Sequence, residues 1–127
     1  MKGRKPSTIV TYSGALTEAP RPPTWLSRDA KAEWKRVAPV LVQRRHLTQT
    51  DLGMVEGFCV AMGRVREIER ELQKPGAVLD PRMVRLQDKA LSTARQIAAE
   101  IGLTPVSRSR PAIVDDDDSE DASDLAL

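Results

Sequence analysis

The stretch from Thr48 to Lys74 constrains the fold most, because its apolar residues recur every three or four positions. This spacing places them along one side of a helix. The stripe consists of Leu52, Val55, Cys59, Met62, Val65, Ile68 and Leu72. The mean spacing is slightly below 3.6 residues, so the stripe drifts around the axis, and a helix that keeps it buried must coil around a partner. The sequence therefore predicts a long helix that packs on its own chain and on another chain.

A second helix is predicted before this one. Ser27 is a good N-cap residue, because its hydroxyl can accept a hydrogen bond from a free backbone N–H group. The apolar face that follows consists of Ala30, Trp34, Val37, Ala38 and Leu41. We expect Trp25 and Trp34 to be core anchors, and we expect Pro39 to kink the helix or to end its first part.

A third helix is predicted from Pro81 to about Ile101, with Asp80 as its N-cap and Gly102 as its stop. It follows a break at Pro75-Gly76 and should form an antiparallel hairpin with the central helix. The predicted fold is all-α, with an N-terminal helix and a long helical hairpin. The first helix can cover only one broad side of the hairpin, so we expect copies of the chain to cover the other. The predicted interface residues are Leu52, Val55, Phe58, Met62, Val65, Leu91, Ala94 and Ala98.

Charge divides the chain into three parts: a flexible basic arm (1–24), a helical domain (25–110) and a disordered acidic tail (111–127). Seven of the 18 acidic residues and none of the 20 basic residues lie in the tail, so it carries −7 and the rest of the chain carries +9. A basic body with a separate acidic tail points to a polyanion partner. We favour nucleic acid over the alternative that the charges keep an oligomer soluble.

The candidate DNA contacts lie in the arm and along the first helix. A short Gly-Arg-Lys-Pro run can lie extended in a minor groove, and basic residues at helical spacing can contact phosphates. In both places a solvated basic segment is the alternative interpretation. The candidate residues are Lys2, Arg4, Lys5, Arg28, Lys31, Lys35, Arg36, Arg44 and Arg45.

Several classes of function have no support in the sequence. Cys59 is the only cysteine, so there is no internal disulfide and no cysteine-based zinc site. The consecutive acids Asp115–Asp118 lack the glycine turn and the distal glutamate of an EF-hand loop. There is no phosphate-binding glycine loop and no nucleophile elbow, and no apolar run has the length of a membrane span. We therefore expect a cytoplasmic protein with no enzyme activity, cofactor, metal or membrane partner.

Five short motifs in this order resemble the small terminase subunits of tailed double-stranded DNA phages. They are Gly3-Arg4-Lys5-Pro6, Pro22-Pro23-x-Trp25-Leu26, Ala30-x-x-Glu33-Trp34-Lys35-Arg36, Leu47-Thr48-x-x-Asp51, and Ala99 to Pro105 followed by Ser107, Arg108 and Arg110. The resemblance implies a non-catalytic, ring-forming adaptor in the host cytoplasm. Such an adaptor binds viral double-stranded DNA and presents it to the terminase large subunit, which has the ATPase and the nuclease.

Two other functions remain open at this stage. One is a helical adaptor that binds only proteins, in which the basic groups merely confer solubility. The other is a small transcription regulator, which would need a short recognition helix after a tight turn and a dimeric assembly. The first helix and the start of the second, joined by Arg45–Thr48, could form such a pair of helices.

Overall fold

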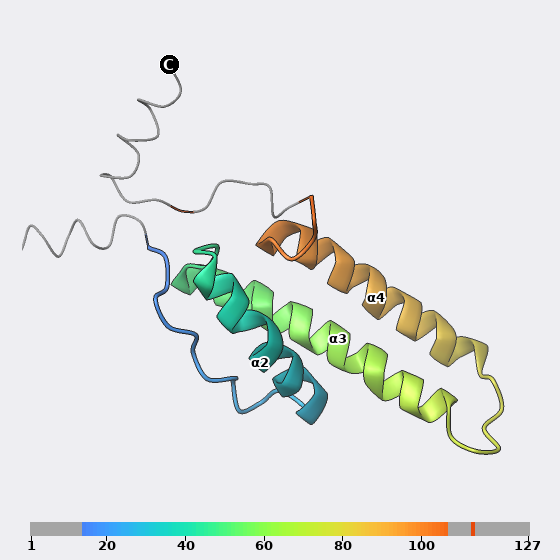
Figure 1. The fold of residues 1–127 in the computed structure, drawn as a ribbon. Coiled ribbons are helices and arrows are strands. Elements are labelled where there is room, and N and C mark those ends of the chain that lie inside the picture. Colours follow the sequence, from blue (N-terminus) through green and yellow to red (C-terminus); the bar gives the residue numbers. More distant parts are fainter. Residues whose placement is uncertain (1–13, 107–112, 114–127) are drawn as a thin grey trace, which may run out of the picture.

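The computed structural model describes residues 14–106 and residue 113, and these include three α-helices (Figure 1). Helix α2 runs from Arg28 to Gln43, α3 from Leu52 to Leu72 and α4 from Pro81 to Ile101, with a 3-10 turn, η1, over Gln49–Asp51. Helices α3 and α4 form the antiparallel hairpin, and α3 lies between α4 and α2. The predicted all-α class is confirmed. Residues 1–13 and most of the predicted acidic tail lie outside the described residues.

The helix ends follow the cap chemistry in the sequence. The Ser27 hydroxyl accepts a hydrogen bond from the Ala30 backbone N–H at 3.2 Å. At the start of α4, the Asp80 carboxylate accepts one from the Arg82 N–H at 2.9 Å. Helix α4 ends at Gly102, whose φ of +87° lies in the left-handed region that glycine tolerates best. These three predictions are confirmed.

The central helix is slightly shorter than the stretch that predicted it. Thr48 and Asp51 close the preceding turn, because the Thr48 backbone N–H donates to the Asp51 carboxylate at 2.9 Å. This contact organises the 3-10 turn, and the α-helix begins one residue later, at Leu52. The chain thus forms a short 3-10 turn first and continues directly into the α-helix.

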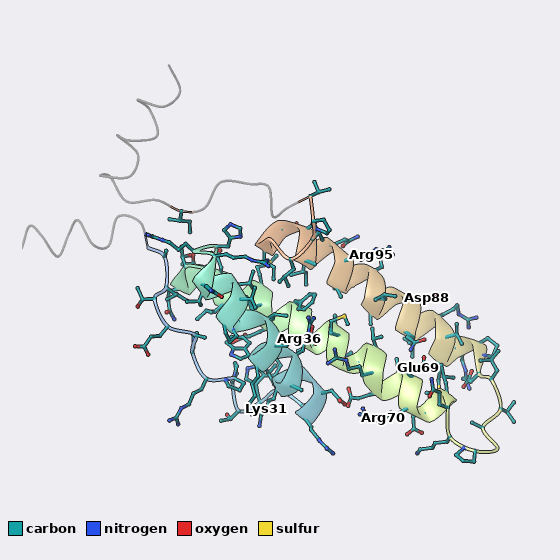
Figure 2. The ribbon with its side chains drawn as sticks, viewed as in Figure 1. Lys31, Arg36, Glu69, Arg70, Asp88 and Arg95 are labelled. Carbon is teal, nitrogen blue, oxygen red and sulfur yellow. The ribbon has the colours of Figure 1, made fainter. Side chains whose placement is uncertain are left out.

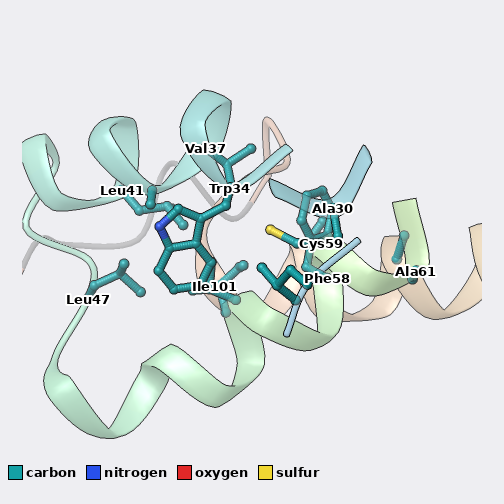
Figure 3. Packing of buried hydrophobic residues seen from close by; sticks show 14 of the residues in the cluster. Ala30, Trp34, Val37, Leu41, Leu47, Phe58, Cys59, Ala61 and Ile101 are labelled. Atoms are coloured by element: carbon teal, nitrogen blue, oxygen red, sulfur yellow. The ribbon is translucent and has the colours of Figure 1, made fainter. Parts of the chain in front are cut away.

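The core fills the angle between α2, α3 and the C-terminal end of α4 (Figure 3). Trp34 is its largest side chain and is only 2% exposed. The indole N–H donates to the Pro20 carbonyl at 2.8 Å, so the ring is both buried and satisfied. The other fully buried side chains above alanine in size are Leu41, Leu47, Glu33, Val37, Val55 and Cys59.

Close backbone approach between α2 and α3 depends on one glycine. A Cβ atom added to Gly63 would lie 3.0 Å from the Ala30 backbone nitrogen and 3.3 Å from the Ala30 Cα. Because these are backbone atoms of the neighbouring helix, they cannot swing aside as a flexible side chain would. A glycine at this position therefore lets α2 pack directly on α3.

Two ion pairs also join α2 to α3. Glu33 is completely buried, and its carboxylate pairs with Arg36 on its own helix and with Arg66 of α3 at 2.8 Å. Nearer the start of α2, Asp29 pairs with Arg70 of α3, and this hydrogen-bonded partner lowers the pKa of Asp29 below its usual value. A buried carboxylate with two guanidinium partners fixes the register of the two helices.

The hairpin itself is joined by Gln87 of α4. Its side-chain amide donates to the Val65 carbonyl at 3.1 Å and to the Glu69 carboxylate at 2.8 Å. Further along, a Cβ atom on Gly57 would lie 3.4 Å from Ile97, which is ordinary packing distance. Helices α3 and α4 are thus in contact over most of their length.

The structure corrects the expectation for Trp25 and excludes one of the two alternatives for Pro39. Trp25 is 63% exposed, so the prediction that it anchors the core was wrong. The adjacent Leu26, 4% exposed, enters the core in its place. Helix α2 continues through Pro39 to Gln43 and does not end at the proline.

The described part of the predicted arm is attached to the helical domain. The Leu16 backbone N–H donates to the Leu47 carbonyl at 2.8 Å, and Ala15 forms an antiparallel bridge with Thr48. Together with the hydrogen bond from Trp34 to the Pro20 carbonyl, these contacts hold residues 14–24 alongside α2. This part of the chain thus has defined contacts with the helical domain.

Candidate nucleic-acid interface

The predicted basic stripe lies on the flank of α2 that faces away from the core. Arg28 and Lys35 are exposed and Lys31 is half-buried. Successive members are three and four residues apart, so the stripe extends about 10 Å along the helix at 1.5 Å per residue. Figure 2 labels Lys31 beside α2, on the side away from α3 and α4. This geometry brings the three cations to one surface, where phosphate groups could contact them.

Arg36 also lies on α2, but its charge is already balanced. Its Nε donates to one oxygen of Glu33 at 3.2 Å, and a terminal nitrogen donates to the other. This hydrogen-bonded carboxylate raises the pKa of the Arg36 guanidinium. Because its partner is buried, Arg36 is held as part of the α2–α3 connection. The role of Arg36 in DNA binding stays a prediction. Because it is paired with Glu33, its guanidinium is less available to a phosphate than the side chains of Lys31 and Lys35 are.

Arg44, Arg45 and His46 form what we term the basic corner, at the C-terminal end of α2. The His46 N–H donates to the Leu41 carbonyl at 3.0 Å and the Arg45 N–H donates to the Val42 carbonyl at 2.9 Å. This is the double hydrogen-bond pattern of a Schellman ending, which requires a left-handed residue. That residue is Arg45, with a φ of +59°.

An arginine in this backbone position carries a cost that glycine would avoid. The left-handed conformation costs an L-residue roughly 1–2 kcal/mol. Helix α4 has the same need for a left-handed residue at its end and satisfies it with Gly102. A strained residue that keeps a long cationic side chain is a pointer to function, because strain tends to persist where a side chain is needed. This strain could not be predicted from the residue type, since arginine does not mark a left-handed position.

The basic corner is packed against the end of α4. A Cβ atom on Gly102 would lie 2.6 Å from His46 Nδ1, so the imidazole occupies the space beside that glycine. His46 is half-buried. The contact fixes the turn after α2 relative to α4.

Three of the candidate DNA contacts, Lys2, Arg4 and Lys5, lie outside the described residues. The remaining six lie along α2 and on the turn that follows it. The structure thus brings Arg28, Lys31 and Lys35 together on one flank of α2 and places the basic corner at its C-terminal end.

The predicted interface residues divide into two groups. Four of them are buried in the core of this chain, so they have no surface to offer to a second chain: Val55, Phe58, Ala94 and Ala98. Leu52, Met62 and Val65 are half-buried, and Leu91 is 40% exposed. The periodicity correctly marked the apolar side of each helix, but it did not distinguish contacts within the chain from contacts between chains.

An apolar groove of about 810 Å³ is present on the hairpin instead. We refer to it as the hairpin groove. Its mouth carries two exposed large apolar side chains, Trp25 and Leu86, and two cations, Arg64 and Lys89. The remaining lining residues are Gly57, Val60, Ala61, Ile68, Ala90, Thr93 and Ile97. Trp25 joins the groove from outside the hairpin, a position that its sequence neighbours did not predict.

Other site types find no basis in residues 14–106 and 113. In that part of the chain no group of three or more histidine, cysteine, aspartate or glutamate side chains is placed to hold a metal ion. No helix there has both the length and the apolar character to cross a membrane. Burial raises the pKa of the Cys59 thiol to about 12, which leaves it protonated and unreactive at neutral pH.

Comparison with known protein families gives a match over most of the chain. Residues 30–118 match the family model described as "Phage terminase, small subunit". The matched region includes almost all of α2 and the whole of the α3–α4 hairpin, so it covers most of the described fold. No curated protein and no solved structure matches the chain.

Proposed function

Because the chain belongs to the phage terminase small-subunit family, we propose that it is the DNA-recognition and adaptor component of a viral genome-packaging motor. In this role it binds viral double-stranded DNA in the host cytoplasm and regulates the large subunit, which supplies the ATPase and nuclease activities. The small subunit itself is non-catalytic. The family match carries this proposal, and the basic flank of α2 gives it a physical basis.

The proposed DNA contact is made by the stripe and the basic corner together. From Arg28 to Arg44 the helix spans about 24 Å, which is long enough to contact several phosphates of one duplex. Phosphate contacts of this kind position a protein on DNA and are insensitive to sequence. Lys31 and Lys35 are the best residues for a test, because neither has a role in the core.

We propose that copies of the chain cover the hairpin groove and close into a ring. A head-to-tail contact that closes on itself produces a cyclic assembly. Each added copy brings another basic flank, so weak phosphate contacts are multiplied. The exposed Trp25 and Leu86 are the proposed anchors of this contact, in place of the four core residues that the sequence suggested.

The test is binding to duplex DNA by the chain with Lys31→Glu and Lys35→Glu. Each lost phosphate contact lowers the salt dependence of binding by about one unit of slope, and affinity at low salt should fall at least tenfold. A matched control replaces Arg85 and Arg95 by Glu, which gives the same change in net charge on α4. Figure 2 shows Arg95 there, separated from Lys31 by α3.

Three outcomes of this experiment separate the interpretations. A loss confined to the α2 variant supports the proposed DNA contact. Equal losses of DNA affinity in both variants would mean that the stripe acts only through the net charge of the protein. Absence of salt-sensitive duplex binding in the unaltered chain would favour the protein-only adaptor.

A further inference from the structure

The chain returns to the basic corner after α4. The Ile113 backbone N–H donates to the Arg45 carbonyl at 3.2 Å. Figure 1 marks residue 113 as a short coloured piece of the chain near the C-terminal end of α2. The last described residue before the acidic run is thus in direct contact with the centre of the corner, far from it in sequence.

The residues that follow are strongly acidic. Asp115–Asp118 begin two positions after Ile113, and residues 114–127 contain seven acidic groups and no basic ones. Two residues of extended chain reach about 7 Å, so the first carboxylate is tethered within that distance of Ile113 along the chain. This is shorter than the screening length of roughly 8–10 Å at physiological salt. The tethered acids therefore act on the corner at high effective concentration.

We propose that residues 114–127 bind back on the basic corner and compete there with the phosphates of DNA. The inference rests on the proposed DNA-binding function and adds a regulatory element to it. The occupant is this chain's own tail, because the Ile113–Arg45 hydrogen bond holds the start of the tail at the corner and because the two charges are opposite. A tethered ligand of this kind needs only weak intrinsic affinity, since its effective concentration is in the millimolar range.

Arg45 provides a clean way to remove one cation of the corner. Its backbone has a φ of +59°, a conformation that glycine adopts readily. The substitution Arg45→Gly therefore keeps the Schellman ending and the two carbonyl hydrogen bonds of the turn. It deletes the cation without straining the fold.

The test compares duplex DNA binding by four proteins: the unaltered chain, a variant with Asp115–Asp118 all changed to Asn, Arg45→Gly, and the combination. At about 50 mM salt the Asn variant should bind roughly threefold to tenfold more tightly than the unaltered chain. In the Arg45→Gly background the same change should gain clearly less. A matched control neutralises Glu120, Asp121 and Asp124, which are farther from the corner, and should have a smaller effect.

A second measurement does not depend on DNA. His46 is the only histidine, so its ring proton resonances are unambiguous, and it adjoins Arg45 in the corner. If the tail binds there, these resonances at fixed pH shift when salt is raised in the unaltered chain, and shift much less in the Asn variant.

The outcomes divide as follows. Equal DNA affinities for the unaltered chain and the Asn variant would overturn the competition. An equal gain in the Arg45→Gly background would also overturn it, because the tail would then act through net charge alone. If no protein bound DNA, the proposed function and the competition would fail together, and the His46 resonances would show whether the tail still occupies the corner.

Discussion

Replacing Trp25 by Ala is the most informative perturbation of the proposed assembly. The side chain is 63% exposed in the single chain, at the mouth of the hairpin groove. A fully covered tryptophan buries up to about 250 Å², so roughly 160 Å² of this side chain is left to be covered by a neighbour. The free subunit should tolerate the change, because most of the residue is exposed in the single chain.

The magnitude follows from that area. At about 25 cal/mol per Å², complete covering would contribute at most about 4 kcal/mol to each contact between subunits. Covering of half the area would contribute about 2 kcal/mol, which corresponds to roughly a 30-fold change in the association constant. In a closed ring every subunit has two such contacts, so the effect on assembly is compounded.

Sedimentation equilibrium over a range of protein concentrations measures this change directly. Trp25→Ala should move the dissociation midpoint to at least tenfold higher concentration. The control is Leu79→Ala in the α3–α4 loop, a residue that is 70% exposed and outside the groove. If Trp25→Ala assembled at the same concentration as the unaltered chain, the groove would not be the contact between subunits.

Three further predictions concern the fold. In urea unfolding, Gly63→Ala should lower the free energy of unfolding by about 1–3 kcal/mol, because the new Cβ meets the backbone of α2. Gly53→Ala has open space around it and should raise the free energy of unfolding by about 0.5–1 kcal/mol. A change of the same sign for both variants would refute the close approach of α2 and α3. Cys59 should react with a thiol reagent at pH 8 only after denaturation, and rapid labelling of the folded chain would contradict its burial. The hydrogen bond from Arg70 lowers the pKa of Asp29, so the pair stabilises the fold fully above about pH 3.8, and this contribution is lost as pH falls through the lowered pKa. Asp29→Asn should therefore reduce stability at pH 7, and its effect should shrink steadily as pH falls below about 3.8.

The helix ends were predictable because cap chemistry acts over only a few residues. The side chains of Ser27 and Asp80 can cap the start of a helix, and glycine at position 102 can adopt the left-handed conformation that ends one. Each of these signals needs only the residue itself. Arg45 shows the limit of that reasoning. Arg45 and Gly102 both have the left-handed conformation, but arginine rarely adopts it. The strain at Arg45 is therefore evident only from the structure.

The two tryptophans show why burial was harder to predict. Trp25 precedes the first helix and Trp34 lies within it, and the sequence favoured a core position for each. Trp34 is buried because it packs against α3 and donates a hydrogen bond to the Pro20 carbonyl. Before the helix, the chain instead places Leu26 in the core and leaves its neighbour Trp25 exposed. Such outcomes depend on contacts between distant parts of the chain.

The candidate site was predictable in part for the same reason. The spacing of Arg28, Lys31 and Lys35 on one helix is enough to place them on one flank. The pairing of Arg36 depends on Glu33, which is buried against Arg66 of the next helix, so its reduced availability could not be read from α2 alone. The hairpin groove likewise exists only once α3 and α4 are packed.

The native mass of the purified chain at moderate salt, without DNA, shows whether the subunits assemble by themselves. We predict a single closed multimer larger than a dimer, held by the hairpin groove, which presents several α2 flanks to one duplex. A monomer or a dimer that persists at high protein concentration would contradict it.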